Sequence, residues 1–184
     1  MNDNVLELVD LFQKCMAEDS VIQHFNIIGF GLNGVVLIAK NSRDYCIKTI
    51  YTDSLKEEII KINKQDGVSD YYLDYLKDNL GNVKNLNQEF NMYKEISSYP
   101  SLKNLIPELF FPIENQHTIK YLILEFINGE HCLIEGLLEI NDKDVEIGIN
   151  EFKENGYLFG DKIEWIKKSD GNVTFIDFDS ISKI

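Results

Sequence analysis

A short run of glycines limits the fold of this chain more than any other feature. Residues 29–36 read Gly-Phe-Gly-Leu-Asn-Gly-Val-Val and match the pattern G-x-G-x-x-G-x-V. Glycines at this spacing let a backbone approach phosphates closely. Residues 35–39 are apolar and rich in β-branched side chains, so we expect a strand to follow. A dinucleotide-binding turn would open a helix instead, so the run indicates a hairpin between antiparallel strands, with a plain glycine turn as the alternative.

A lysine follows at the spacing expected for the next strand. Lys48 lies within the largely apolar segment 45–51. This segment and the segments 25–29 and 35–39 are joined by short polar connections, which predicts an antiparallel meander. A lysine on the third strand can reach back to phosphates under the glycine hairpin. An exposed lysine on an alternating strand is the competing interpretation.

The remaining patterns mix helices with strands. Helical spacing of apolar residues predicts helices over 4–24, 54–64, 70–80, 86–97 and 133–155. Strands are predicted over 109–113 and 121–127, joined by the polar residues 114–118, with a late hairpin of 165–167 and 173–176. Tyr71, Tyr72 and Tyr75 have helical spacing and are expected to serve packing. The class is α+β in two lobes, with an N-terminal helix and an antiparallel sheet in an N-lobe over 1–127 and mainly helices in a C-lobe over 128–184.

Acidic residues mark the late hairpin. Asp161 precedes it, and Asp177 follows it as the first residue of an Asp-Phe-Asp tripeptide. A carboxylate oxygen such as that of Asp177 suits a hard cation like Mg²⁺. Either aspartate alone could be a turn residue or a helix cap. Two of them around one hairpin favour a functional interpretation.

Taken together, these motifs resemble the protein-kinase superfamily. The resemblance is closest to the minimal kinase-fold effectors that pathogenic bacteria inject into eukaryotic cells. One such group phosphorylates the host ninety-kilodalton heat-shock chaperone, and another binds host ubiquitin-conjugating enzymes. The resemblance covers most of the chain from Phe25 to Ser180. It implies that residues 1–184 form a single minimal kinase-like domain that binds ATP and Mg²⁺.

The resemblance also implies roles for single residues. The hairpin residues would cover the nucleotide, and they are Gly29, Gly31, Gly34 and Val36. Lys48 would contact the α- and β-phosphates and pair with Glu89 on the helix 86–97, for which Glu95 is the competitor.

Further roles fall in the second half of the chain. Glu125 and Ile127 would offer backbone hydrogen bonds to the adenine. Asp161 would orient or deprotonate a substrate hydroxyl, and Asp177 would hold Mg²⁺.

The sequence departs from the kinase pattern at several positions. The usual His-Arg of the catalytic loop is Phe159-Gly160, and the expected asparagine is Ile166. The glycine of the usual Asp-Phe-Gly is Asp179. Without an activation loop, we expect no control by activation-loop phosphorylation.

The net charge and the cysteine content limit which binding partners and which cellular compartment are expected. The net charge of −13 argues against nucleic acid and against an anionic membrane surface. Three scattered cysteines (Cys15, Cys46 and Cys132) are expected to be reduced thiols. No apolar run is long enough for a membrane-spanning helix. We expect a monomer located in the cytoplasm, or secreted into the cytosol of a host cell, where its partner is a protein such as a chaperone or a ubiquitin-pathway protein.

Four functions follow from these features. The first is transfer of the γ-phosphoryl group of ATP to Ser or Thr of a partner protein. The second is a pseudokinase or protein-binding module that holds ATP without catalysis. The third is another ATP-dependent transfer, such as nucleotidylation, and the fourth is an α+β domain without nucleotide affinity.

Overall fold

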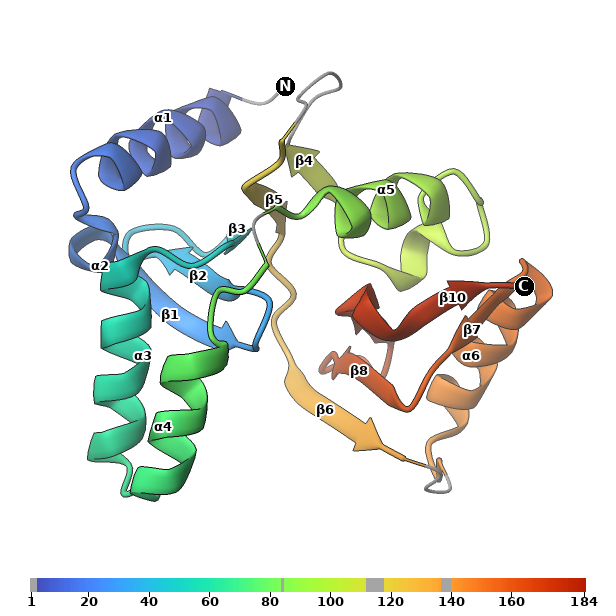
Figure 1. The fold of residues 1–184 in the computed structure, drawn as a ribbon. Helices are drawn as coiled ribbons and strands as arrows, with labels where there is room; N and C mark the ends of the chain where they lie inside the picture. Colours follow the sequence, from blue (N-terminus) through green and yellow to red (C-terminus); the bar gives the residue numbers. More distant parts are fainter. Residues whose placement is uncertain (1–2, 84, 112–117, 137–139) are drawn as a thin grey trace. The chain divides into compact units, whose positions relative to one another are not determined.

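The computed structural model describes residues 3–83, 85–111, 118–136 and 140–184, with helices and strands in both halves of the chain (Figure 1). The chain divides into two compact units. The first comprises Met1–Asn87 and Phe110–Leu124, and the second comprises Gln88–Leu109 and Glu125–Ile184. The predicted α+β class is confirmed. Within the described ranges, none of the helices is both long and apolar enough to span a lipid bilayer.

A five-stranded antiparallel sheet forms the centre of the first unit. Its strands lie in the order β1-β2-β3-β5-β4 and are β1 (Phe25–Phe30), β2 (Val35–Ala39), β3 (Tyr45–Thr49), β5 (Tyr121–Glu125) and β4 (Leu109–Phe111). The predicted meander of the first three strands is therefore confirmed. Gly29 pairs with Val36 and Phe30 with Val35, so the glycine run forms the tip of the β1–β2 hairpin. Most of the connection predicted at 114–118 lies outside the described residues.

The N-terminal helix covers this sheet. The predicted helix over 4–24 is interrupted, since α1 (Asp3–Ala17) is followed by the short α2 (Val21–His24). Asp19 between them has a left-handed backbone (φ 52°), which a continuous helix cannot contain. Fully buried Phe12 makes edge-to-face contacts with Phe25 at 5.6 Å and with Tyr121 at 4.9 Å. Helix α1 thus contributes aromatic packing to the core of the sheet.

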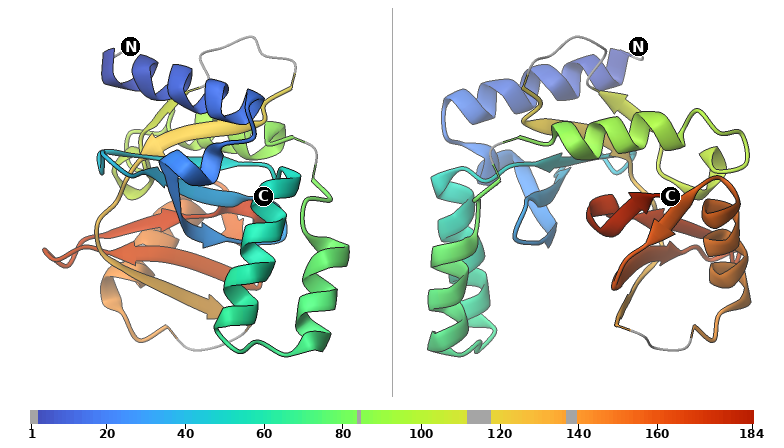
Figure 2. Two further views of the ribbon diagram at one scale, coloured as in Figure 1. Left: turned by 90° about the vertical axis from the view of Figure 1, so that its left-hand side faces the viewer. Right: turned by 45° about the vertical axis from the view of Figure 1, so that its right-hand side comes forward.

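Two helices form an antiparallel hairpin between β3 and the next segment (Figure 2). They are α3 (Asp53–Gln65) and α4 (Asp70–Asn79), close to the predicted 54–64 and 70–80. Each begins at a hydroxyl cap, because Thr52 accepts from the Leu55 amide and Ser69 from the Tyr72 amide. Gly67 (φ 78°) makes the turn between them.

The second unit mixes helices with two small sheets. It contains α5 (Asn87–Ile96) and α6 (Lys143–Glu154), a three-stranded sheet and a two-stranded sheet. The first sheet has the order β6-β8-β9, with β6 (Glu130–Glu135), β8 (Lys162–Lys167) and β9 (Val173–Ile176). The second pairs β7 (Tyr157–Phe159) with β10 (Ile181–Lys183).

The prediction of a helical C-lobe was wrong at the start of the helix expected over 133–155. The helix expected over 133–155 begins only at Lys143, and residues 130–135 form strand β6 instead. Strand β6 pairs with β8, for example Cys132 with Trp165, and this partner lies far along the chain. Local helical spacing was therefore outweighed by a long-range strand pairing.

Candidate functional site

The glycine hairpin is held by hydrogen bonds at its tip. The Gly31 amide donates to the Gly34 carbonyl at 2.9 Å, and the Tyr51 hydroxyl donates to the Gly31 carbonyl at 2.7 Å. Burial raises the pKa of Tyr51, so this hydroxyl stays protonated and keeps its donor role. A Cβ atom at Gly34 would lie 2.7 Å from the Thr49 carbonyl oxygen, whereas one at Gly31 would meet nothing within 4 Å. Gly34 is therefore required for the close approach of the hairpin to β3.

This difference predicts an unequal response to alanine. Gly34→Ala should lower the free energy of unfolding by about 1–3 kcal/mol, because the new methyl group overlaps a backbone carbonyl that cannot move away. Gly31→Ala is the matched control and should change stability by less than about 1 kcal/mol. Urea unfolding followed by circular dichroism measures both values. Equal losses in the two variants would contradict the close contact.

Lys48 lies on β3 directly opposite Val36, the second residue of the strand that leaves the glycine hairpin. It is only 9% exposed. Lysine is almost never buried without a compensating partner, because its charge loses hydration. The exposed-lysine interpretation is therefore wrong, and a buried lysine side chain lies on the strand beside the hairpin within the first unit.

Of the two glutamate candidates on α5, Glu89 is the buried one. Glu89 is 6% exposed. The carboxylate of Glu95 instead forms an ion pair with Lys183, whose hydrogen bond lowers the pKa of Glu95. Glu89 belongs to the second unit and Lys48 to the first. The predicted Lys48–Glu89 pair therefore stays a prediction.

Asp177 has a strained backbone. Its φ of 59° and ψ of 88° lie in the left-handed region, and among described residues other than glycine only Asp19 shares a positive φ. Such conformations cost of order 1–3 kcal/mol and persist where the surroundings enforce them. The next residue supplies that enforcement. Phe178 is 4% exposed and packs edge-on against Tyr93 of α5 at 4.8 Å and near Phe152 of α6 at 6.2 Å.

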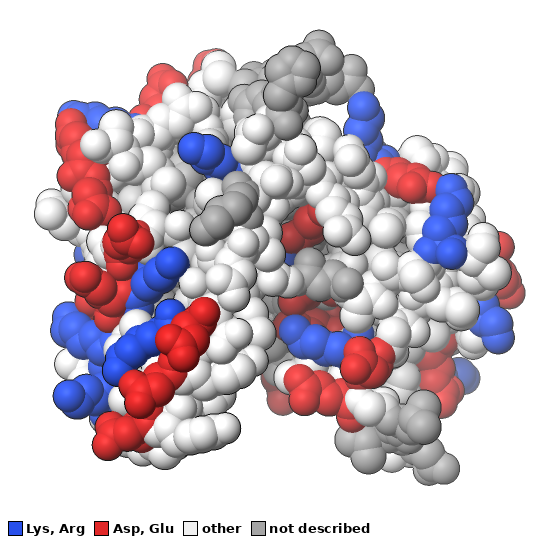
Figure 3. All heavy atoms as spheres, in the orientation of Figure 1, with Lys and Arg blue, Asp and Glu red and all other residues white. Residues whose placement is uncertain are grey.

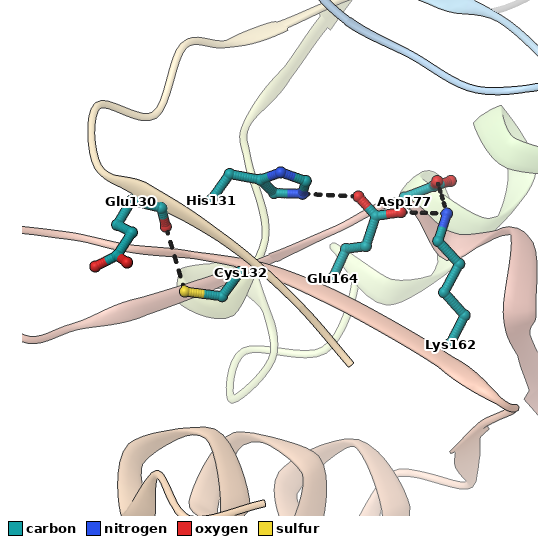
Figure 4. A network of polar contacts seen from close by, with 6 residues as sticks. All are labelled: Glu130, His131, Cys132, Lys162, Glu164 and Asp177. Carbon is teal, nitrogen blue, oxygen red and sulfur yellow. Dashed lines mark hydrogen bonds and ion pairs between the residues drawn. The ribbon is translucent and has the colours of Figure 1, made fainter. Parts of the chain in front are cut away.

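A row of polar contacts leads away from the Asp177 carboxylate (Figure 4). Lys162 Nζ lies 3.2 Å from Asp177 Oδ2 and also contacts the Glu164 carboxylate. The other Glu164 oxygen lies 2.9 Å from His131 Nε2. Burial acts to lower the pKa of Lys162, but the two carboxylates outweigh it and hold that pKa above its ordinary value. Lys162 is therefore a cation placed between two carboxylates.

The sequence patterns did not single out three of the residues in this row of polar contacts, namely His131, Lys162 and Glu164. The alternation of strand β8 offered a signal for two of them, since residues 162 and 164 share one face of a strand. The contribution of His131 depends on the β6–β8 pairing, which was not predicted.

The segments that carry Asp161 and Asp177 are joined by backbone hydrogen bonds within the second unit. The Gly160 amide donates to the Ser180 carbonyl at 2.8 Å, and β7 pairs with β10 beside this bond. The Asp161 carbonyl accepts from the Gly136 amide at 2.6 Å. The Asp161 residue is exposed. Strand β8 begins at the next residue, so no loop separates Asp161 from the hairpin. Ile166 stands where the kinase pattern has an asparagine. It lies within β8 opposite Thr174, so this position belongs to a strand and not to a loop.

A Mg²⁺ ion at Asp177 would need ligands from outside the protein. Among the described residues, no group of three or more His, Cys, Asp or Glu side chains could hold a metal ion. Mg²⁺ usually binds one or two carboxylates and completes its octahedral shell with waters and substrate phosphates. Asp177 therefore fits an ion that arrives on a nucleotide, but not a metal held by protein ligands alone. Such an ion would have to replace the Lys162 ammonium at Asp177.

The two predicted adenine-binding residues lie at the end of β5 and just beyond it. The Glu125 amide donates to the Glu108 carbonyl at 2.8 Å, and its carboxylate accepts from the Glu108 amide at 3.3 Å. An adenine contact of Glu125 would therefore use its carbonyl oxygen. Ile127 is 7% exposed.

Comparisons with known proteins do not assign the chain to a family. No family model matches it, and no curated protein matches it significantly. Among solved structures, it is similar to the protein Rv3197 from Mycobacterium tuberculosis, which was solved in complex with erythromycin. The TM-score is 0.39 at 14% sequence identity, and the match covers 87% of this chain but 46% of that chain. The chain thus matches less than half of the length of this neighbour.

Proposed function

We propose that this chain binds Mg–ATP and transfers its γ-phosphoryl group to Ser or Thr of a partner protein, as a minimal protein kinase. The observation that carries the proposal is the strained Asp177, clamped by buried Phe178 at the end of a β-hairpin. Strain of this kind is concentrated at functional sites.

The proposal gives a role to several residues, which are taken one unit at a time. In the first unit, the hairpin over 29–34 presents backbone amides, and the Lys48 ammonium neutralises phosphate charge. In the second unit, Asp177 would hold the cation carried on the phosphates, and Asp161 would accept the hydroxyl proton of the substrate as ADP leaves. A bound Mg²⁺ would supply charge neutralisation on the β- and γ-phosphates. Positioning and charge stabilisation account for most of the rate in this reaction class.

A second candidate function is favoured by specific observations. Strand β8 takes the place of the usual catalytic loop, Ile166 lies in the asparagine position, and Lys162 already neutralises Asp177. A nucleotide-binding protein without catalysis is compatible with all three. It would bind ATP through the same residues and transfer nothing.

Lys48→Met is expected to weaken ATP binding at least about tenfold, because one charge-assisted contact to phosphate is lost. The measurement is the thermal shift of the full chain on adding ATP with Mg²⁺. Saturation at about one hundred times the dissociation constant should stabilise the wild type by about 2.7 kcal/mol. The melting temperature without nucleotide reports whether the variant folds, and Lys40→Met, an exposed lysine just beyond β2, is the matched control.

Transfer is then measured with labelled ATP in a eukaryotic lysate. Label from the γ-phosphate on a protein supports the kinase, and label from the α-phosphate indicates nucleotidylation instead. ATP binding with neither label assigns the second candidate function. Unchanged ATP binding in Lys48→Met would refute the proposed site.

A further inference from the structure

The exposed face of helix α4 carries two adjacent rows of side chains. Tyr71, Tyr72 and Tyr75 are 86%, 43% and 42% exposed, so the expectation that they serve packing was wrong. The residues that pack are Leu73 and Leu76, which are 4% and 1% exposed. The three tyrosines therefore lie outside the buried stripe that Leu73 and Leu76 form. Tyr72 and Tyr75 stack on each other with ring centroids 5.9 Å apart.

An acidic row runs beside the tyrosines. Asp70, Asp74 and Asp78 recur every four residues and therefore lie along one line of the helix. Lys77 is the one basic residue of α4 and pairs with Asp74 at 2.6 Å, with both side chains largely exposed. Such a pair contributes little and is readily exchanged for another. Figure 3 shows acidic side chains over the α3–α4 hairpin, with basic side chains also present there.

We propose that this α4 face (Tyr71, Tyr72, Tyr75, Asp70, Asp74 and Asp78) docks a basic segment of a partner protein. The charge of the face favours a basic occupant, because α4 carries three aspartates and one lysine. Tyrosine rings attract the cationic groups of Lys and Arg and also cover apolar surface, and the neighbouring aspartates pair with the same groups. Exposed aromatic groups on one face of a helix are typical of interaction sites.

Other occupants match the face less well. A second copy of the chain carries a net charge of −13, so it would be repelled by the acidic row. Nucleic acid and anionic membranes would be repelled for the same reason. The docking face lies entirely on one helix of the first unit and does not depend on ATP binding.

The test uses two synthetic helical peptides of about 18 residues with the same apolar face, one with Lys and Arg on its polar face and the other with Glu. Binding to the full chain is measured by calorimetry, and its location by amide shifts in NMR spectra. We expect the basic peptide to shift residues 70–79 and the acidic peptide to bind at least about tenfold more weakly. Affinity for the basic peptide should fall as salt is added, because screening weakens exposed charge pairs.

Two variants remove the two rows separately. Tyr72→Ser/Tyr75→Ser and Asp74→Asn/Asp78→Asn should each weaken binding of the basic peptide about tenfold. The charge-matched control Glu7→Gln/Asp10→Asn removes two exposed carboxylates of α1, and Ile147→Ser removes an exposed apolar side chain of α6 that is 52% exposed. Both controls should bind as the wild type does.

Three results would overturn the proposal. The first is equal binding by wild type and both α4 variants, and the second is equal binding of the acidic and basic peptides. The third is self-association in sedimentation experiments that Tyr72→Ser/Tyr75→Ser abolishes, since a second copy would then be the occupant.

Discussion

Replacing Asp177 by Asn is expected to lower phosphoryl transfer at least about a thousandfold while the chain stays folded. The amide keeps the size of the carboxylate but loses the charge that would hold the cation of Mg–ATP. Asn also tolerates the left-handed backbone of this position, so the strain should not increase. The initial rate of transfer from γ-labelled ATP measures the effect, and the melting temperature reports the fold.

Asp144→Asn is the control for this variant. Asp144 is exposed on α6 in the same unit, and its replacement removes the same charge away from the proposed site. Transfer should then stay near the wild-type rate. If Asp177→Asn and Asp144→Asn transfer phosphate equally well, Asp177 does not contact the nucleotide.

Phe152→Ala is expected to cost about 3–5 kcal/mol of the free energy of unfolding of the second unit. Phe152 is fully buried at the centre of an aromatic cluster, with ring contacts at 4.9 Å to Phe159 and 5.4 Å to Phe175. Removing the ring leaves a cavity between α6 and the two small sheets. A loss of this size is a large share of the usual stability of a domain.

Urea unfolding followed by the fluorescence of Trp165 measures this loss, because the single tryptophan lies in β8 of the same unit. Ile147→Ala on the same helix removes an exposed side chain and should cost less than about 1 kcal/mol. ATP binding should also weaken in Phe152→Ala, since Phe178 loses one of the rings beside it. Equal unfolding midpoints for the two variants would refute the central role of the ring.

Local signals made the first unit largely predictable. The β1–β2 hairpin follows from a turn-forming glycine run between two apolar segments, and α3 and α4 follow from helical spacing of apolar residues with a break at Gly67. These interactions join residues close in the chain, so a sequence pattern records them directly. The break between α1 and α2 at Asp19 was missed, because the apolar spacing continues across it.

Long-range pairing made the second unit harder to predict. Strand β6 exists because β8 lies beside it, and the two strands are separated by α6. The exposure of the α4 tyrosines was mispredicted for a related reason. Helical spacing shows that Tyr71 and Tyr75 share a face, but only the packing of Leu73 and Leu76 decides which face turns inward.

For the candidate site, the sequence by itself determined the kinds of residues and their order: a glycine hairpin, then Lys48, then Asp161 and Asp177. These follow from residue chemistry and from short-range turns. Only the tertiary structure decided that Lys48 is buried, that Gly34 lies against β3, and that Asp177 is strained and paired with Lys162. The physical reason is that burial, backbone strain and ion pairing depend on neighbours brought together by folding, which no local pattern of residues contains.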